Sequence, residues 1–393
     1  MKRIAGIARR MDGIAPFRVV EIASRARELE AAGRAVIHME IGEPDFATPE
    51  PIVAAGIAAL RNGCTHYAPA LGLPELRQAI ADFYRSRYGV TVPAARVVVT
   101  TGSSAALLLA LATVVNPGAR VLMTDPGYPC NRHFVRLLDG VPDTVPVGED
   151  TGYQLTPELV DRHWTDDTAA VMLASPANPT GMLVSQPNLD AIAALVRRRG
   201  GVLIVDEIYH GLVYGADCPS ALNAPGDVFV INSFSKYFCM TGWRLGWLVV
   251  PDAYCNAVER LAQNLFIAAP TPAQHAALAA FAPATIATLE DWRREFQARR
   301  DFLLPALTAL GFRVRCVPEG AFYIYADCSS VAADSYVFAH DLLERAGVAI
   351  TPGIDFGDHH AARHVRFAYT CSMDQLRDGV IRVAEYLQRR VPD

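Results

Sequence analysis

Short apolar runs alternate with longer amphipathic stretches between about residues 95 and 250. The runs are rich in β-branched residues and are separated by stretches of helical periodicity and by Gly and Pro clusters. This alternation predicts an α/β fold, with an open, mainly parallel sheet sandwiched by helices. The predicted strands are 97–99, 120–123, 170–173, 202–205, 228–231 and 245–250.

The pattern changes after this region. Residues 285–310 are rich in Arg and Glu and predict a long helix, while apolar runs at 321–325 and 365–369 predict strands of a smaller α+β domain. Another helix is expected over 16–32. The predicted divisions are an N-terminal segment (1–45), a large domain (46–285) and a small C-terminal domain (286–393).

Composition agrees with an ordinary globular protein of about two domains, because 393 residues carry 51% hydrophobic and 20% charged side chains. The formal net charge of -5 provides no global field that would attract nucleic acid or an anionic membrane. The eight cysteines contain no Cys-x-x-Cys pair and indicate neither a disulfide framework nor a thiolate zinc site. We therefore expect a reducing, cytoplasmic location.

The first ten residues contain charges where an export signal would need an apolar stretch, so no such signal is expected. The apolar run 105–115 is too short to span a bilayer and predicts a buried helix instead. No membrane partner is expected.

One lysine lies among hydroxyl side chains directly after an apolar run. In the segment 233–246, Ser233 and Ser235 precede Lys236, and Arg244 follows eight residues later. A lysine forms an imine with an aldehyde only as the free amine, which requires burial or nearby positive charge. An arginine binds phosphate bidentately. The segment thus favours a phosphate-bearing aldehyde cofactor over the alternative, a surface lysine near a framework arginine.

The segment resembles the lysine signature of class I/II aminotransferases, which use pyridoxal 5'-phosphate (PLP) on a fold-type I scaffold. The resemblance extends from about Gly42 to Arg366. It implies that Lys236 forms the Schiff base with PLP and that the two serines and the arginine of its segment contact the cofactor. It also implies amino transfer from an L-amino acid to a 2-oxo acid, such as 2-oxoglutarate or pyruvate.

Two hydroxyl residues begin an Ala- and Leu-rich helix directly after the run 97–99. Ser103 and Ser104 lie where free backbone amides and the positive end of the helix dipole would meet an anion. A plain serine N-cap is the alternative. The resemblance assigns the PLP phosphate to this turn and to both serines.

Two proline-rich loops follow later runs. Tyr128 is held by two prolines and a glycine, which suits either an aromatic face presented to a ring or ordinary loop packing. Asn178 precedes Pro179 in an Asn-Pro-Thr-Gly loop whose alternative is a simple turn. The resemblance implies that Tyr128 stacks on the pyridine ring and that Asn178 contacts the cofactor's phenolic oxygen and the substrate site. It also suggests a cis Asn178-Pro179 bond.

An acid follows the run 202–205, 30 residues before Lys236. Burying Asp206 without a partner is costly, so either a ligand or a helix N-cap role is expected. In the resembled family this acid lies opposite the pyridine nitrogen and keeps it protonated, which makes the ring an electron sink. Tyr209, three residues later, would donate to the phenolic oxygen.

Substrate binding is predicted at two separate positions. Arg366 lies in an apolar strand and needs an anionic partner, either a substrate α-carboxylate or a structural ion pair. Gly42 lies in a turn that resembles the family's glycine loop over the same carboxylate. Residues near Phe17, Tyr128 and Phe322 are predicted to line an apolar pocket for the substrate side chain.

Tyr67 matches a family tyrosine that reaches the phosphate of the neighbouring subunit, which implies a homodimer with shared sites. The resemblance also implies that the N-terminal segment packs with the small domain. His359, His360 and His364 lack the carboxylate or cysteine neighbours of a strong metal site, so we expect surface residues and no metal.

Two other functions fit the same motifs. A carbon-sulfur lyase would use the same residues for elimination. A PLP-fold regulator that senses a ligand would need a DNA-binding extension, and the chain contains no basic helix-turn-helix pattern.

Overall fold

The computed structural model describes residues 6–389. The expectation about an export signal therefore falls partly on residues 1–5, which lie outside the described residues. Within the described range, no helix combines the length and apolar character needed to span a lipid bilayer.

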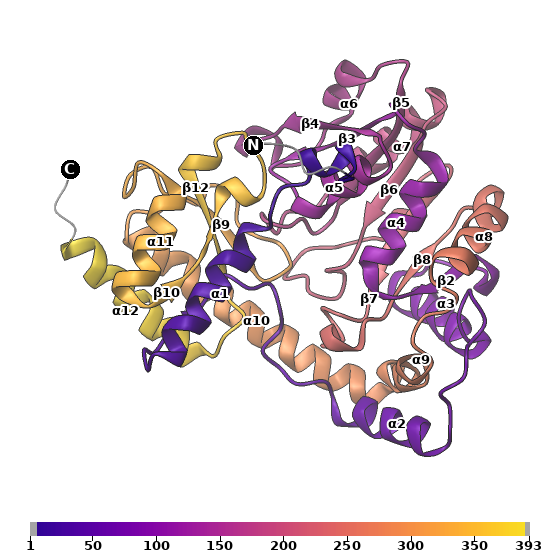
Figure 1. Cartoon of the computed structure of the whole chain (residues 1–393), viewed down its shortest axis with the longest axis horizontal. Coiled ribbons are helices and arrows are strands. Elements are labelled where there is room, and N and C mark those ends of the chain that lie inside the picture. The colour runs from indigo at the N-terminus through magenta and orange to yellow at the C-terminus, as the bar shows by residue number, and fades with distance from the viewer. Residues whose placement is uncertain (1–5, 390–393) are drawn as a thin grey trace.

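The helices and strands follow the predicted alternation (Figure 1). The strands of the central sheet are β2 (Val97–Thr100), β3 (Arg120–Asp125), β4 (Val141–Pro146), β5 (Thr168–Ala174), β6 (Val202–Asp206), β7 (Val228–Ser233) and β8 (Gly246–Val249). The helices up to residue 278 are α1 (Arg18–Ala31), α2 (Glu50–Arg61), α3 (Pro74–Tyr88), α4 (Gly102–Val114), α5 (Pro129–Leu137), α6 (Pro157–His163), α7 (Gln186–Arg198), α8 (Cys255–Leu265) and α9 (Thr271–Leu278).

The central sheet has the strand order β2-β8-β7-β6-β5-β3-β4. Its pairings are parallel except for the two made by β8, which runs antiparallel to β2 and to β7. The mainly parallel α/β sheet predicted from the sequence is confirmed. All six predicted runs form strands.

Alternate side chains of each strand enter two different cores, because successive residues of a strand point to opposite faces. On β6, Val202 and Ile204 join the core beneath α4, α5 and α8, whereas Leu203 and Val205 join the core beneath α6 and α7. Since both faces are covered, each strand reads as a continuous apolar run.

The sequence analysis missed β4, the edge strand beside β3. Its sequence, Val-Pro-Asp-Thr-Val-Pro, contains two prolines and an acid, and only one of its residues is buried. An edge strand pairs with a neighbour on one side only, so it does not need a continuous hydrophobic run. Because the N–H groups on its outer side donate to no other strand, proline is tolerated there.

The C-terminal part contains a three-stranded antiparallel sheet. The two predicted strands are present as β9 and β12, and the long helix is present as the 27-residue α10. The elements are α10 (Pro283–Ala309), β9 (Tyr323–Asp327), α11 (Ser335–Ala346), β10 (Val348–Ala349), β11 (Thr351–Pro352), β12 (His364–Ala368) and α12 (Met373–Arg389).

The N-terminal segment lies against this C-terminal part. The short strand β1 (Ile37–His38) pairs in parallel with β10, and α1 contacts β11 and α11. Figure 1 shows α1, in indigo, beside the yellow and orange elements of the C-terminal part, which lie near the opposite end of the colour bar.

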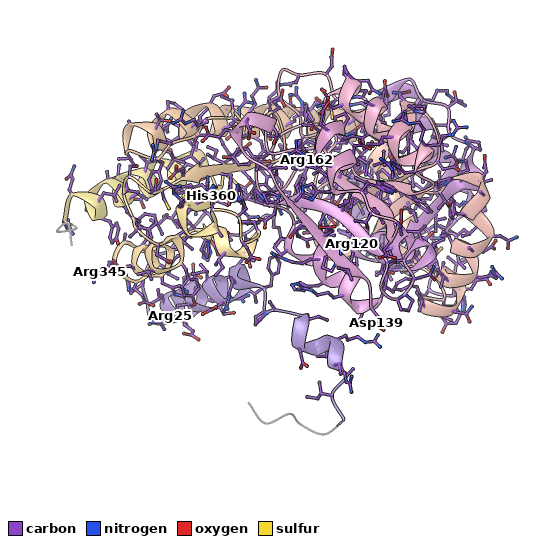
Figure 2. The ribbon with its side chains drawn as sticks, turned by 90° about the horizontal axis from the view of Figure 1, so that it is seen from above. Arg25, Arg120, Asp139, Arg162, Arg345 and His360 are labelled. Atoms are coloured by element: carbon purple, nitrogen blue, oxygen red, sulfur yellow. The ribbon has the colours of Figure 1, made fainter. Side chains whose placement is uncertain are left out.

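Charged side chains are distributed over several sides of the molecule. Figure 2 shows Arg25 and Arg345 near α1 and α11, and Arg120 with Asp139 near β3 and α5. Many of these arginines are paired with acids, as in the 2.6 Å contact between Arg120 Nη2 and Asp143 Oδ2. The labelled arginines therefore do not gather into one basic face.

The three predicted surface histidines differ in burial. His360 is exposed, whereas His359 and His364 are half-buried. The ring of His364 stacks on Tyr325 with ring centroids 4.7 Å apart. Burial lowers the pKa of His364. The prediction of a surface residue is therefore wrong for His364, because its strand position on β12 places its ring beside β9. Among the described residues, no group of three or more His, Cys, Asp or Glu could hold a metal ion.

Candidate active site

A cavity of about 450 Å³ lies where the parallel strands end. Its wall includes residues that follow the carboxyl ends of β2, β3, β5, β6 and β7, which is where open α/β sheets bind ligands. The predicted site residues on this wall are Gly42, Ser103, Ser104, Tyr128, Asn178, Asp206, Tyr209, Ser235, Lys236, Arg244 and Arg366.

Lys236 follows β7 and extends into the cavity, where its ammonium Nζ donates a 2.5 Å hydrogen bond to the backbone oxygen of Gly42. Burial is the largest cause that lowers the pKa of Lys236 to about 8, with nearby Arg366 and Arg244 adding to the effect and Glu43 opposing it. The free amine is thus accessible near neutral pH. The sequence left burial and nearby positive charge, such as that of Arg244, as the two possible causes, and burial is the larger one.

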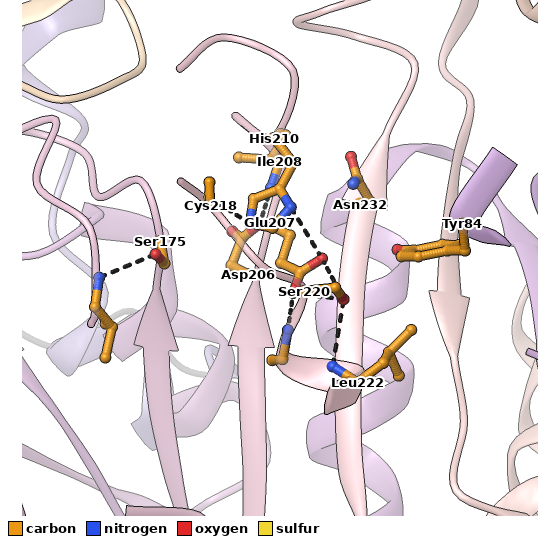
Figure 3. Close-up of polar contacts among 12 residues, drawn as sticks. Tyr84, Ser175, Asp206, Glu207, Ile208, His210, Cys218, Ser220, Leu222 and Asn232 are labelled. Carbon is orange, nitrogen blue, oxygen red and sulfur yellow. Dashed lines mark hydrogen bonds and ion pairs between the residues drawn. The ribbon is translucent and has the colours of Figure 1, made fainter. Parts of the chain in front are cut away.

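Asp206 and Glu207 are consecutive buried acids with different surroundings (Figure 3). Asp206 lines the cavity and accepts one hydrogen bond, from Ile208 N–H at 3.0 Å. Burial raises its pKa to about 7. A turn rather than a helix follows it, so the helix N-cap alternative does not hold. Its second oxygen remains available to a ligand in the cavity.

Glu207 faces the opposite side of the same strand end. It accepts hydrogen bonds from Ser220 Oγ at 3.0 Å and from Ala221 N–H at 2.6 Å, while burial raises its pKa to about 8. His210 Nδ1 lies 3.3 Å from Glu207 Oε2, and burial lowers the pKa of His210 to about 3, so this contact involves a neutral ring. Figure 3 shows that the contacts of Glu207 go to Ser220, Ala221 and His210. Glu207 therefore holds neighbouring loops together and has a structural role.

The start of α4 and Arg244 form one end of the cavity. Helix α4 has no side-chain cap at its N-cap residue Thr101, so the plain serine N-cap alternative does not hold. Gly102 has φ +75, and a Cβ placed there would lie 2.6 Å from Arg244 Nη2. Free amides, two hydroxyls and a guanidinium therefore meet around a space that suits a phosphate.

Ser233 lies behind the cavity wall rather than on it. Its Oγ accepts a hydrogen bond from Ser235 N–H at 3.0 Å and lies 2.9 Å from Ser235 Oγ. Ser233 is 1% exposed. It is therefore placed to shape the loop that carries Lys236 rather than to touch a ligand.

Arg366 reaches the cavity from β12 and is 3% exposed. Its Nη1 donates to Asn178 Oδ1 at 2.8 Å and its Nη2 to the backbone oxygen of Glu40 at 2.5 Å. Its Nε is buried without a hydrogen-bond partner. Within residues 6–389 it makes no ion pair, which argues against the structural ion-pair alternative and leaves a guanidinium prepared for an anion in the cavity.

Tyr323 is a lining residue that the sequence analysis missed. Its hydroxyl lies 2.9 Å from that of Tyr209, and a Cβ at Gly42 would lie 1.8 Å from Tyr323 Oη, which explains why glycine occupies that position. Residues near Phe322 were expected to line the pocket, and Tyr323 does so, whereas Phe322 itself is 0% exposed and belongs to the core. Phe322 directly precedes β9, and neighbouring side chains of an extended chain point to opposite faces.

Helix α1 supplies another missed part of the site, which we call the α1 wall: Phe17, Val19, Val20, Ala23 and Arg27. Of these, the sequence analysis named Phe17 only. The helical spacing of the others was a detectable signal, but nothing in the local sequence indicates that this helix faces the cavity.

Tyr67 lies outside the cavity and is 87% exposed in the isolated chain. The Asn178-Pro179 bond is cis, as are Asp125-Pro126 and Ser175-Pro176.

The residues of the cavity fit PLP. A phosphate site at α4 and Arg244, an amine of lowered pKa at Lys236 and a buried acid at Asp206 correspond to the three polar parts of that molecule. Tyr128 adds a half-buried aromatic ring to the same wall.

Comparisons with known proteins agree with this geometry. A family model described as Aminotransferase class I and II matches residues 34–383. The chain is 39% identical to a valine–pyruvate aminotransferase of Mycobacterium tuberculosis, covering 95% of this chain and 97% of the relative. It is 37% identical to an aspartate/prephenate aminotransferase of Thermus thermophilus, covering 98% and 99%.

Solved structures show the same architecture. An aminotransferase from Mycobacterium tuberculosis superimposes with a TM-score of 0.95 at 38% identity, covering 98% of this chain and 100% of that one. The Thermus thermophilus aspartate aminotransferase with maleate gives a TM-score of 0.91 at 36% identity, covering 97% and 100%. The chain therefore belongs to the class I and II aminotransferases, a family of PLP-dependent enzymes of fold type I.

Proposed function

We propose that this aminotransferase moves an amino group from an L-amino acid to a 2-oxo acid, with Lys236 as the acid/base for the Cα proton. The observation that carries the proposal is the shared cavity of Lys236 and Arg366, one with a lowered pKa and the other with an unpartnered buried Nε. Bound PLP would supply a carbonyl that condenses with amines and a ring that accepts electrons.

Arg366 is proposed to bind the substrate α-carboxylate. Asn178 holds one nitrogen of its guanidinium and the Glu40 carbonyl holds another, so the group is oriented before a substrate arrives. Gly42 lies on the same wall, where only a residue without a side chain fits beside Tyr323. This arrangement would present Cα to the amine of Lys236.

The remaining residues are proposed to hold the cofactor. Asp206 would accept a hydrogen bond from the protonated pyridine nitrogen. This requires the carboxylate form, which burial disfavours and which the Ile208 N–H and the nearby charge of Lys236 favour. Tyr209 and Asn178 would contact the phenolic oxygen, and Tyr128 the ring face. Ser103, Ser104, Ser235 and Arg244 would bind the phosphate, with Ser233 in support.

We further propose a homodimer in which the exposed Tyr67 reaches the partner subunit's phosphate site.

Domain boundaries near residues 45 and 285 are also proposed, and the second boundary falls in the first turn of α10. The eight cysteines all lie within residues 6–389 and none of them forms a disulfide, which supports a reducing location such as the cytoplasm.

The proposal is tested by loading the protein with PLP, trapping with borohydride and locating the modified residue by peptide mapping. Modification at Lys236, together with exchange of amino groups between amino and 2-oxo acids, is expected. Release of pyruvate and ammonia from cystathionine without such exchange would identify an elimination enzyme instead. Lack of any trapped adduct would refute the assignment of Lys236.

A further inference from the structure

Helix α1 places one cation at the end of an apolar stripe. Val20, Ala23 and Arg27 are spaced by three and four residues, so they share the helix face that lines the cavity. Val20 and Ala23 are apolar, and Phe17 continues the same wall before the helix begins. A substrate that extends along this wall would meet methyl groups first and a guanidinium afterwards.

The Arg27 guanidinium has little to bind within the chain. Its described hydrogen bond goes from Nη2 to Ser24 Oγ at 3.3 Å, and it forms no ion pair with a carboxylate of residues 6–389. On the same helix, Arg18 pairs with Glu21 at 3.2 Å and Arg25 with Glu344 at 2.5 Å. The arginine that faces the cavity is thus the one that lacks an acid.

The cavity contains three arginines, and two of them already have proposed partners. Arg244 lies against the start of α4, where a phosphate fits, and Arg366 is oriented by Asn178. We propose that Arg27 binds the distal carboxylate of a dicarboxylic substrate, so that the amino acceptor is a C4 or C5 dicarboxylic 2-oxo acid rather than pyruvate. This inference rests on the proposed amino transfer.

Glu43 is the acid of the cavity that competes with this assignment. It lines the wall, where its carboxylate accepts a hydrogen bond from Thr241 Oγ1 and raises the pKa of Lys236. Thr241 lies in the segment that leads to Arg244, so Glu43 is held by a partner other than Arg27. If Arg27 served only to pair with Glu43, removing either charge would affect every substrate alike.

The test measures the second half-reaction. Protein loaded with PLP is first converted to its amino form, and kcat/KM is then determined for 2-oxoglutarate and for pyruvate. Arg27→Gln is expected to lower kcat/KM for 2-oxoglutarate by about 10- to 100-fold, the effect of losing a hydrogen bond between charged groups, with a change of less than about threefold for pyruvate. Arg27→Lys should recover part of the loss.

Arg34→Gln is the matched control, since Arg34 is exposed, follows α1 and lies outside the cavity. It removes the same charge and should affect both acceptors equally. Calorimetric binding of glutarate and butyrate to the PLP-loaded protein gives a second readout, in which Arg27→Gln weakens glutarate selectively.

Equal losses for both acceptors in Arg27→Gln would overturn the assignment of Arg27. Wild-type protein that exchanges amino groups only with pyruvate would overturn the dicarboxylate preference. Protein that binds PLP but exchanges amino groups with neither acid would instead refute the proposed function.

Discussion

The two sides of the cavity differ in origin and in burial. The sheet side carries Asn178 and Asp206, which are 7% and 5% exposed, together with Lys236, whose pKa is lowered by burial. The α1 wall comes from a helix that packs with the C-terminal part. Its Ala23 is 5% exposed, but Val20 is 51% exposed and Arg27 is also exposed. The buried sheet side therefore shifts the pKa values of the groups proposed for chemistry, whereas the exposed residues of the α1 wall are suited to selecting a substrate.

The sheet side has a cost in stability. Charged groups are disfavoured where water is excluded, and the strand ends bury the amine of Lys236 and the carboxyl group of Asp206. The packed cores on both faces of the sheet hold these groups in place. The α1 wall has no such requirement. Substitutions on the two sides should therefore differ in how strongly they affect activity and stability.

Lys236→Met should give the strongest contrast, because it removes the proposed acid/base and also a buried charge. We expect activity to fall by at least about 1,000-fold. The cofactor-free variant should be more stable than wild type by about 1–2 kcal/mol below pH 8, since the folded protein then no longer holds a charged amine whose pKa burial lowers to about 8. The gain should decrease as the pH rises through 8. Activity assays and urea unfolding at pH 6 and pH 9.5 provide the measurements.

Asp206→Asn and Glu207→Gln compare two buried acids on one strand end. Asp206→Asn should lower kcat by about 100- to 1,000-fold, the scale of losing one preorganised electrostatic partner. Glu207→Gln should retain most activity but lose about 1–3 kcal/mol of stability, because its hydrogen-bond network is disrupted. Similar kinetic losses in both variants would contradict the assignment of Glu207 as structural.

Arg366→Gln should raise KM for amino acids and lower kcat/KM by about 30- to 300-fold, which corresponds to losing a charge-assisted bidentate contact of about 2–3 kcal/mol. Arg366→Lys should recover little of this, because one ammonium cannot reproduce the planar contacts to Asn178 and the Glu40 carbonyl. Recovery to near wild-type values in the lysine variant would show that charge alone suffices.

His38→Gln should have the smallest effect, a small loss of folding stability, because His38 helps to anchor α1. His38 bonds Glu40 at 2.7 Å and Glu30 of α1 at 3.2 Å, and chiefly the bond to Glu40 raises its pKa from 6.5 to about 9. A raised pKa stabilises the folded protein fully below pH 6.5, and this contribution is lost as the pH rises through 9. Because the ring is partly solvated, we expect wild type to exceed His38→Gln by about 1 kcal/mol at pH 6. Unfolding curves of the two proteins should converge above pH 9.

Much of the sheet side could be predicted from the sequence. Apolar runs long enough to be buried on both faces identified six strands, and parallel strands bring the residues that follow them to one edge. That reasoning predicts that Asn178, Asp206 and Lys236 lie close together, and the cavity contains all three. It failed for β4, whose edge position removes the need for an apolar run.

The sheet, the order of the polar groups along its edge and their chemical types follow from the amino-acid sequence, because period and residue type are local properties. The folded chain was needed to show which α1 residues face the cavity, that Tyr323 rather than Phe322 lines it, and that burial more than neighbouring charge lowers the pKa of Lys236. These depend on contacts between residues hundreds of positions apart and on how much water each group loses, neither of which is encoded within any short stretch of chain.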